Sequence, residues 1–300
     1  MPELPDVEVY VERLEAKLAG QRLLGTRLAS PFLVRTYDPP LSALSARRFL
    51  RAHRIGKRIV MGFEQDLFAV VHLMIAGRFR LREKGATLPG KHSLCGFDFE
   101  QATLWLTEAG SKKRASLHLV RGTAALAEFD RGGIDPLSAT LAQFDAALRR
   151  ENRTLKRALT DPRILNGIGN AYSDEILFSA RLSPVKRTSQ IDAAEMKRLY
   201  RACGKTLSAW LERTRRAVGD GFPEQVTAFR EGMAVHGRYR EPCRSCGTPV
   251  QRVRYADSEL NYCPTCQTGG RLLADRGLSR LLGGDWPKTL AELEERLGRA

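Results

Sequence analysis

Two cysteine pairs near the end of the chain place the strongest constraint on what it can fold into. Cys243 and Cys246 form the first pair, and Cys263 and Cys266 form the second after sixteen intervening residues. Two C-x₂-C pairs at this separation are typical of a tetrahedral Zn²⁺ site built from four thiolates. A disulfide framework is the alternative, but it is typical of short secreted domains and this chain has 300 residues. We therefore predict one structural zinc ion held by these four cysteines.

The segment between the two cysteine pairs predicts a short β-hairpin. From Val250 to Tyr255, apolar residues are interspersed with Arg252 and Arg254. This pattern suits a strand whose two faces differ in polarity. A metal ion would then close a hairpin that offers two cations to phosphate groups.

The net charge indicates the class of partner. Lys and Arg number 49 against 34 Asp and Glu, which gives a formal net charge of +15, and hydrophobic residues make up 43% of the chain. That hydrophobic content is enough to build folded cores, so a disordered basic tail is excluded. A strongly basic folded chain favours a polyanionic partner, most often nucleic acid. The alternative is that the charge only keeps the protein soluble.

The same composition bears on the compartment. No run of apolar residues is long enough to cross a membrane, and the N-terminal segment lacks the pattern of a secretory signal. We therefore expect a cytoplasmic, nucleoid-associated protein with no membrane partner.

The chain reads as a β-rich part followed by a helical part. Residues 5–19 carry one apolar helical stripe, and residues 58–120 form short strand-like runs that predict a β-sandwich or barrel. A linker composition follows at residues 130–136. Ser138 and Asn152 are candidate N-caps. Helical spacing then recurs in residues 137–150, 154–159, 171–180 and 193–216. The predicted class is α+β, with segments at residues 1–130, 131–235, 236–268 and 269–300.

The first residues could form a reactive centre. Initiator Met is commonly removed before a small second residue, which would leave Pro2 as the terminal amine. An α-amine has a pKa near 8, so an appreciable fraction is neutral and can attack a sugar C1′. Glu3 beside it could move protons. The alternative is that Pro2 only starts the chain and that Glu3 and Asp6 favour the N-terminus of the helix.

Several other polar residues have both a structural and a functional interpretation. Lys57 precedes a strand and is either a phosphate anchor or a cation lying along an apolar surface. His72 ends an apolar strand and is more often a hydrogen-bonded core residue. The turn containing Gly167 and Gly169 could expose N–H groups to phosphate or simply join two helices. Lys112, Lys113 and Arg114 form either a solvated turn or a DNA-facing loop.

Taken together, these motifs resemble the formamidopyrimidine-DNA glycosylase/endonuclease VIII family, and more closely its formamidopyrimidine branch. The match runs in the family's order from residue 2 to about residue 268. It rests on Met1-Pro2-Glu3-Leu4-Pro5, Gly56-Lys57-Arg58, His72-Leu73 with Ala76-Gly77, Lys91-His92, Asp161, residues 166–172 with Glu175, Gly237-Arg238, Glu241-Pro242-Cys243 and the four-cysteine finger.

The resemblance implies an N-terminal β-sandwich catalytic domain flanked by helices, a helix–two-turn–helix domain and a zinc-finger hairpin. It implies a monomeric base-excision-repair enzyme acting on double-stranded DNA with damaged bases or abasic sites. Pro2 would attack C1′, Glu3 would be the general acid, and Lys57 would bind phosphate and assist β- and δ-elimination. Zinc would be structural. The implied DNA contacts are Lys57, His72, Ile75, His92, Lys112, Lys113, Arg114, Lys156, Gly167, Gly169, Asn170, Arg252 and Arg254.

The chain departs from the family's pattern at the residues that would recognise the damaged base. Ser258, followed by Glu259, stands where the family usually has a phosphate-binding Arg, for which Arg252 or Arg254 would substitute. Ile75 stands at the family's intercalating Met. Residues 112–116 replace the family's Arg-Arg-Phe loop. Residues 219–235 are fewer than the lesion-capping loop of the 8-oxoguanine enzymes contains, and the C-terminal tail extends past the point where family members usually end. We therefore expect a preference other than 8-oxoguanine opposite cytosine, first of all small ring-opened or saturated bases.

Two other classes remain as alternatives. A non-catalytic DNA damage-binding protein could use the same scaffold, but it would have no need of Pro2, Glu3 and Lys57 together. An RNA-binding zinc protein is less favoured, because no aromatic platform for splayed bases stands out.

Overall fold

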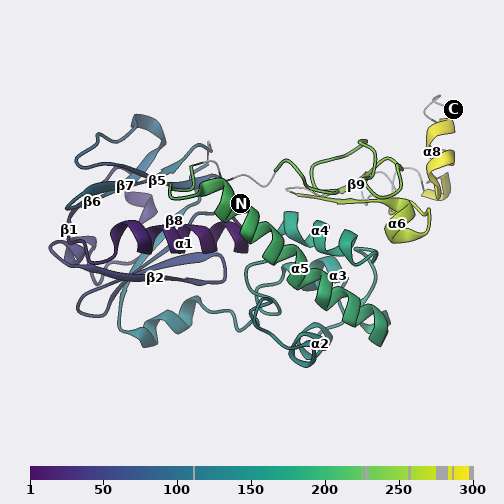
Figure 1. Ribbon diagram of the computed structural model, residues 1–300, viewed down its shortest axis with the longest axis horizontal. Helices are drawn as coiled ribbons and strands as arrows, with labels where there is room; N and C mark the ends of the chain where they lie inside the picture. The colour runs from purple at the N-terminus through teal and green to yellow at the C-terminus, as the bar shows by residue number, and fades with distance from the viewer. Residues whose placement is uncertain are drawn as a thin grey trace. The chain divides into compact units, whose positions relative to one another are not determined.

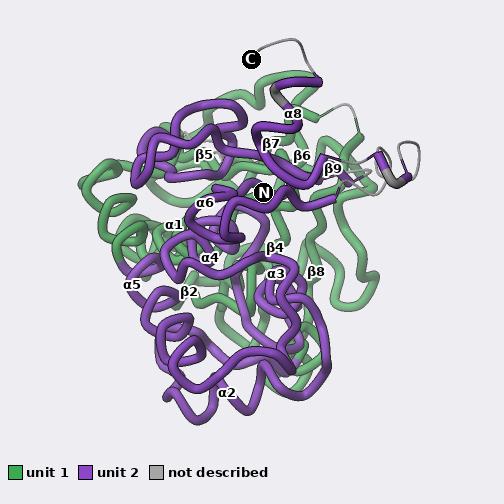
Figure 2. The backbone as a smooth tube through the Cα atoms, turned by 90° about the vertical axis from the view of Figure 1, so that its right-hand side faces the viewer, with its two compact units in different colours: residues 1–131, 209–228 green, residues 132–208, 229–300 purple. Residues whose placement is uncertain are grey.

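A computed structural model describes residues 1–110, 112–224, 226, 230–255, 258–274, 283–285 and 287–296. It divides into two compact units, the first made of residues 1–131 and 209–228 and the second of residues 132–208 and 229–300 (Figure 2). The division at residue 131 lies in the segment with linker composition, whereas residues 209–228, expected with the helical domain, group with the first unit. Among the described residues, no helix is both long and apolar enough to span a lipid bilayer.

The first unit contains two antiparallel sheets, an N-terminal helix and the end of a helix that it shares with the second unit (Figure 1). Helix α1 (Leu4–Leu18) packs against β2 and β3. The sheets have the orders β1-β6-β7-β5 and β2-β3-β4-β8. The strands are β1 (Leu23–Leu28), β2 (Phe49–Ile55), β3 (Arg58–Phe63), β4 (Leu67–His72), β5 (Gly77–Glu83), β6 (Ser93–Phe99), β7 (Ala102–Glu108) and β8 (Ser116–Arg121). The predicted sandwich is confirmed, and β1 and β2 extend it beyond the residues expected to form strands.

The core of the first unit explains why β4 is an unbroken apolar run. Leu67, Ala69 and Val71 belong to the main core, to which both sheets and α1 contribute. Phe68 and Val70, on the other face of the strand, pack in a second cluster with Phe129 of the 3₁₀ helix η4 (Thr123–Phe129). Burial of both faces removes the usual alternation of apolar and polar residues. The strand therefore holds its last residue, His72, on a rigid support.

The second unit begins with helices whose N-caps differ from those expected. Helix α2 (Leu141–Arg149) is capped by Thr140, whose Oγ1 accepts from the N–H of Gln143, and α3 (Leu155–Thr160) is capped by Thr154. The predictions of Ser138 and Asn152 are wrong by two residues each. Each Thr stands directly before the first helical residue, where its hydroxyl can reach an unpaired N–H of the first turn. Helices α4 (Asn170–Ser179) and α5 (Ala193–Val218) follow, and α5 passes into the first unit at residue 209.

A metal-binding hairpin completes the second unit, and its prediction is confirmed. Strands β9 (Gln251–Arg254) and β10 (Glu259–Tyr262) pair antiparallel, with Arg254 opposite Glu259 and Gln251 opposite Tyr262. Helix α6 (Pro264–Thr268) follows directly, and α8 (Leu290–Arg296) lies in the tail. Both cysteine pairs therefore flank the hairpin.

Candidate functional site

The chain's first residues are buried at the start of α1. Glu3 is the N-cap of the helix, and its backbone N–H donates to Oδ2 of Asp6 at 2.8 Å. Pro2 is buried, and Glu3 and Asp6 are each only 3% exposed. The carboxylate of Asp6 therefore fixes the helix start, and this holds Pro2 and Glu3 in one defined arrangement.

The terminal amine at this site has a lowered pKa. In the structure the amine belongs to Met1, one residue before Pro2. Burial is the largest cause and lowers the pKa; Glu3 opposes it, while the cations Arg78 and Lys57 lower the pKa further. Because a lowered pKa enlarges the neutral fraction at neutral pH, this position favours a nucleophilic amine.

Lys57 and His72 belong to the same region of the first unit. Gly56 and Lys57 form the two-residue turn between β2 and β3, and His72 pairs across the sheet with Arg58. Burial, with Arg58 and then Lys57, lowers the pKa of His72 to about 4. His72 is therefore a neutral imidazole at neutral pH, so any contact it makes with DNA is a hydrogen bond rather than an ion pair.

Ile75 lies on a tight exposed turn between β4 and β5. Its side chain is 55% exposed, and Met74 before it has a positive φ of 52°. A Cβ at Gly77 would lie 2.2 Å from the carbonyl oxygen of Leu73, so only glycine fits there. The turn thus presents an apolar side chain to solvent, as an intercalating residue requires.

Arg78 is a site residue that the sequence analysis did not identify. Its guanidinium donates to the carbonyl oxygens of Ile75, Gly77 and Val226 at 3.1, 2.6 and 2.7 Å. It therefore ties the exposed turn to residue 226 and places a cation near the terminal amine. The available signal was the alternation of arginines at positions 78, 80 and 82, since alternate residues of a strand share a face.

The other two arginines of this strand hold Glu224. Arg80 contacts its carboxylate at 3.1 Å and Arg82 at 2.7 Å. Arg82 also lies over the ring of Trp105, 5.1 Å from the centroid. Strand β5 thus fixes part of the short segment 219–235 within the first unit.

The basic loop 112–114 is closed by a buried carboxylate. Glu108 is 1% exposed, and its Oε2 accepts from the N–H groups of Arg114 and Ala115 at 2.9 and 3.1 Å. The ammonium of Lys113 reaches the carbonyl of Glu108, while the side chains of Lys112 and Arg114 are exposed. Separately, His92 is exposed in the 3₁₀ helix η3 (Gly90–His92).

In the second unit the predicted Gly-rich turn leads into α4. Gly167 has a φ of +83°, and Gly169 is the N-cap of the helix. The side-chain amide of Asn170 donates to the carbonyl oxygen of Glu259 at 2.7 Å, which joins the helix start to β10. Lys156 is buried, and its Nζ donates to the carbonyl of Asn170 at 2.7 Å. Its ammonium thus points into the protein, beneath the Gly-rich turn. Lys156 had been expected to bind phosphate together with that turn.

Beneath this turn lies a buried network that the sequence did not reveal. Asp174, 1% exposed, accepts from Nζ of Lys156 at 2.6 Å and from the N–H of Asn261 at 3.1 Å, and it contacts Nδ1 of His236 at 2.8 Å. Such a group is satisfied only when its partners, distant in sequence, are all in place. The network therefore connects α3, α4 and β10.

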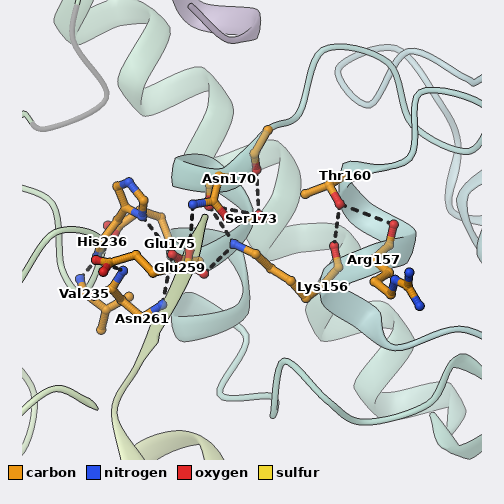
Figure 3. A network of polar contacts seen from close by, with 12 residues as sticks. Lys156, Arg157, Thr160, Asn170, Ser173, Glu175, Val235, His236, Glu259 and Asn261 are labelled. Atoms are coloured by element: carbon orange, nitrogen blue, oxygen red, sulfur yellow. Dashed lines mark hydrogen bonds and ion pairs between the residues drawn. The ribbon is translucent and has the colours of Figure 1, made fainter. Parts of the chain in front are cut away.

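Glu175, which follows in the helix, binds the chain that leads to the zinc finger. Its carboxylate accepts from the N–H groups of Ala234, Val235 and His236 at 2.7, 2.9 and 3.0 Å (Figure 3). Burial raises the pKa of Glu175, and the three backbone donors oppose the rise. Two adjacent acids in a helix with no other charged residue were the available signal for this pairing.

The two candidate substitutes for the missing finger arginine are placed differently. Arg252 contacts the carboxylate of Glu259 at 3.3 Å and lies over the ring of Tyr239, 4.1 Å from its centroid. Arg254 is exposed at the end of β9, opposite Glu259 and near Ser258. Arg252 thus lies against other residues of the second unit, whereas the side chain of Arg254 is exposed to solvent.

The four finger cysteines fit a zinc ion. All four Sγ atoms lie within 4.8 Å of one another, with Cys243 and Cys266 at 3.9 Å and Cys246 and Cys263 at 3.4 Å. Four sulfurs at about 2.3 Å from a tetrahedral Zn²⁺ are about 3.8 Å apart. The predicted structural zinc is confirmed in its ligand set, and its effect is to close the hairpin onto α6.

Three family models match successive parts of the chain. Residues 1–114 match the formamidopyrimidine-DNA glycosylase N-terminal domain, residues 133–220 the formamidopyrimidine-DNA glycosylase H2TH domain, and residues 240–269 a zinc finger found in FPG and IleRS. Together with the fold, they define a DNA-binding repair protein of the helix–two-turn–helix and zinc-finger class.

Curated relatives narrow this class to one family. Over 278 residues, which cover 90% of this chain and 100% of the relative, the chain is 33% identical to the formamidopyrimidine-DNA glycosylase of Thermus thermophilus. It belongs to the formamidopyrimidine-DNA glycosylase family, as the resemblance indicated. It is also 41% identical, over 150 residues, to an uncharacterized formamidopyrimidine-DNA glycosylase-like protein of Mycobacterium tuberculosis, covering 50% of this chain and 93% of that one.

Solved structures agree on the fold. A complex between the Lactococcus lactis Fpg and DNA containing an abasic site aligns with a TM-score of 0.78 at 23% identity, covering 89% of this chain and 99% of that one. A complex of the wild-type protein from the same organism with DNA containing an oxidized pyrimidine aligns equally well, at 24% identity over 89% and 100% of the two chains.

Proposed function

We propose that the protein is a bifunctional DNA glycosylase and abasic-site lyase that removes oxidised or ring-opened bases in base-excision repair. The observation that carries the proposal is the placement of Pro2 and Glu3, both buried at the start of α1. Burial and the cations Arg78 and Lys57 lower the pKa of the adjoining Met1 amine, which supports a neutral amine at this position. Two structures of Lactococcus lactis Fpg that share this fold are complexes, one with DNA containing an abasic site and one with DNA containing an oxidized pyrimidine. They support damaged DNA of this kind as the partner. We expect a monomer that works in the cytoplasm at the nucleoid.

The chemistry begins once removal of Met1 makes the Pro2 nitrogen the terminal amine. Its lone pair bonds to C1′ of the damaged nucleotide as the bond from C1′ to the base breaks, and Glu3 supplies the proton that the departing base or the ring oxygen takes up. The Pro2 nitrogen then loses its proton, the ring oxygen takes up a proton as its bond to C1′ breaks, and the opened sugar is left joined to Pro2 through an iminium. The target base must first leave the stack, because its C1′ is not accessible in the duplex.

Elimination then cuts the strand. The iminium acidifies C2′, and loss of a C2′ proton expels the 3′ phosphate; a second elimination expels the 5′ phosphate. Hydrolysis finally releases the sugar fragment from Pro2. The ammonium of Lys57 pairs with phosphate and assists these proton transfers.

We propose that the preferred lesion differs from 8-oxoguanine opposite cytosine, with small ring-opened or saturated bases preferred. The basic loop 112–114 has no aromatic side chain to fill the space left by an extruded base. Glu224, in the short segment 219–235, is held by Arg80 and Arg82. Both observations favour a pocket that makes few contacts with the damaged base.

Borohydride trapping on duplexes with single lesions tests this function. We expect a covalent adduct with an abasic site and with at least one ring-opened or saturated base. Pro2→Ala should strongly diminish the adduct, because it replaces the secondary amine of proline by a primary amine in a different conformation. Glu3→Gln should lower base excision by about 10²–10⁴-fold while it leaves trapping at a preformed abasic site largely intact.

Two results would contradict the proposal. One is the absence of an adduct with every lesion and with an abasic site; the other is an undiminished adduct in Pro2→Ala. Mass analysis of the N-terminus provides a parallel check, because retention of Met1 would block the amine and favour a non-catalytic protein that binds DNA damage.

A further inference from the structure

A basic groove lies in the second unit, between the end of α4 and the first half of α5. It has a volume of about 500 Å³, and four of its lining residues are cations while none is acidic. The lining consists of Ser179, Ala194, Lys197, Arg198, Arg201, Ala202 and Lys205. None of these residues is among the predicted DNA contacts, so the groove is unassigned.

Three of the cations form a row along α5. Lys197, Arg201 and Lys205 are all exposed and recur every fourth residue, so they share one face of the helix. Successive positions are about 6 Å apart along the helix axis. Like charges at this spacing repel and weaken a helix. The row therefore does not serve the stability of α5, and it offers a line of charge to an extended polyanion.

The charge of this row is not neutralised by the part of the chain that the structure describes. The two acids of α5 are already paired, Glu195 with Lys186 at 2.5 Å and Glu212 with Arg215. Among the described residues, no carboxylate forms an ion pair with any of the three cations of the row. A polyanion could thus bind without displacing an existing partner.

The fourth cation of the groove has a structural role. Nε of Arg198 donates to the carbonyl oxygen of Ala180 at 2.7 Å, at the C-terminal end of α4. It thereby neutralises the partial negative charge of that helix end. The binding capacity of the groove consequently rests on the other three cations.

The groove is separate from the predicted phosphate contacts of the same unit. The Gly-rich turn, Asn170 and Lys156 lie where α4 begins, and Asn170 joins that end to the hairpin of Arg252 and Arg254 through Glu259. Ser179, which lines the groove, is the last residue of α4. Ten residues of helix place the two ends about 15 Å apart. One phosphate group cannot contact both positions, so the groove would bind a phosphate other than the one at the Gly-rich turn.

We propose that this groove binds the phosphate backbone of a second DNA segment while the damaged segment occupies the reaction site. The identity of the occupant rests on the proposed function, because DNA is the extended polyanion that a repair enzyme meets continuously. The contact is independent of base sequence and is controlled by counterion release. It allows the enzyme to pass from one DNA segment to another without release into solution.

A ternary binding experiment tests the proposal on the full chain. The protein is first saturated with an unlabelled duplex containing a tetrahydrofuran abasic analogue, and a fluorescent undamaged duplex is then titrated while anisotropy is recorded. We expect the second duplex to bind with a slope of log K against log[KCl] of about −3, close to one for each cation of the row. In Lys197→Gln/Arg201→Gln/Lys205→Gln, the affinity for the second duplex should fall at least about ten-fold and the slope should approach zero.

A matched variant controls for overall charge. Arg51→Gln/Arg121→Gln/Arg216→Gln removes three exposed cations outside the groove and should bind the second duplex as the wild type does. The single variant Arg201→Gln should lower the slope by about one. Because the three cations of the row make no ion pairs with described residues and repel one another along α5, the groove variants should unfold at or slightly above the wild-type temperature. Equal second-duplex binding by the groove variant and the wild type would overturn the proposal.

Two further measurements separate this inference from the proposed function. If the wild type binds a poly-glutamate peptide at the groove but no second duplex, the occupant is an acidic protein and the proposal fails. Borohydride trapping at an abasic site should be equal in the groove variant and the wild type. If the wild type gives no adduct while second-duplex binding still depends on the row, the proposed enzyme activity fails and the groove assignment stands.

Discussion

At the scale of single residues, Arg78 combines two tasks. Its guanidinium holds three backbone carbonyl oxygens, those of Ile75, Gly77 and Val226, and its charge lowers the pKa of the terminal amine. A side chain that contacts backbone from two segments is fixed in position, so its effect on the amine is fixed as well. The pKa of this amine is thus linked to the conformation of the exposed turn.

Arg78→Gln should shift the pH dependence of adduct formation to higher pH. Burial remains the main cause that lowers the pKa of the amine, but loss of the cation removes one source of repulsion, so the protonated amine is stabilised and its pKa rises. The neutral fraction at pH 6 then falls. We expect a trapping rate a few-fold lower than wild type at pH 6 that converges with it near pH 9, measured by single-turnover trapping.

Arg80→Gln is the matched control. Arg80 is a cation on the same face of β5, but it contacts Glu224 and is not among the main groups that shift the pKa of the amine. Its pH profile should coincide with that of the wild type. An Arg78→Gln profile displaced to lower pH, or superimposed on the wild type, would show that the charge of Arg78 does not control the amine.

At the scale of elements, the zinc hairpin depends on its metal for closure. Strands β9 and β10 have four residues each, too few to be stable as an isolated hairpin. Removal of zinc with a strong chelator should therefore unfold the hairpin, and DNA affinity should fall by at least about ten-fold because Arg252 and Arg254 lose their positions. The first unit has its own core and should keep its β-sheet signal in circular dichroism.

The metal content of the native protein should be one zinc per chain by atomic absorption. Cys246→Ser should reproduce the effect of the chelator. Cys203→Ser should leave zinc content and DNA affinity unchanged, since Cys203 is buried in α5 and is not among the four clustered cysteines. Full DNA affinity after complete zinc removal would disprove a structural role for the metal.

Most elements were predictable because their signals are local. The period of apolar residues located α1, α4 and α5 within two residues at each end, and the cysteine spacing located the hairpin. The caps were missed because Ser138 and Asn152 resemble the true caps chemically, and only the position of the first helical turn separates them. Strands β1 and β2 were not expected because arginines interrupt their apolar pattern.

The site was predictable only in part. Pro2, Glu3 and Lys57 came from a motif, whereas the inward position of Lys156 depends on Asp174, eighteen positions later in the chain. The bond from Asn170 to Glu259 spans a still longer separation. Such pairings arise from tertiary packing, and no local pattern records them.

At the scale of the whole molecule, the net charge of +15 should be visible in the salt dependence of DNA binding. Each phosphate that a cation neutralises contributes about −0.9 to the slope of log K against log[salt]. If Lys57, the 112–114 loop and the finger arginines all contact phosphates, we expect a slope between about −4 and −6. The slope refers to one protein bound to one lesion-containing duplex. Fluorescence anisotropy from low to physiological salt measures it.

Lys57→Gln should reduce the steepness of this slope by about one. Glu64→Gln, an exposed position paired with Arg48, should leave the slope unchanged and serves as a control for a change of surface charge. A flat plot over this range would mean that phosphate contacts contribute little to binding, and the charge would then serve solubility.

The composition of the first unit from residues 1–131 and 209–228 also bears on how the protein is made. Val226 belongs to the main core of that unit and Phe222 packs against it, 5.7 Å from the ring centre of Tyr10, yet both are synthesised after residues 132–208. At about 5–20 residues per second, the nascent sandwich waits on the order of ten seconds for its last core residues. During that interval apolar surface of the first unit is exposed to chaperones at the ribosome. A messenger RNA truncated before codon 222 yields a chain that lacks these core residues, and such a chain is a substrate for degradation rather than a DNA-binding protein.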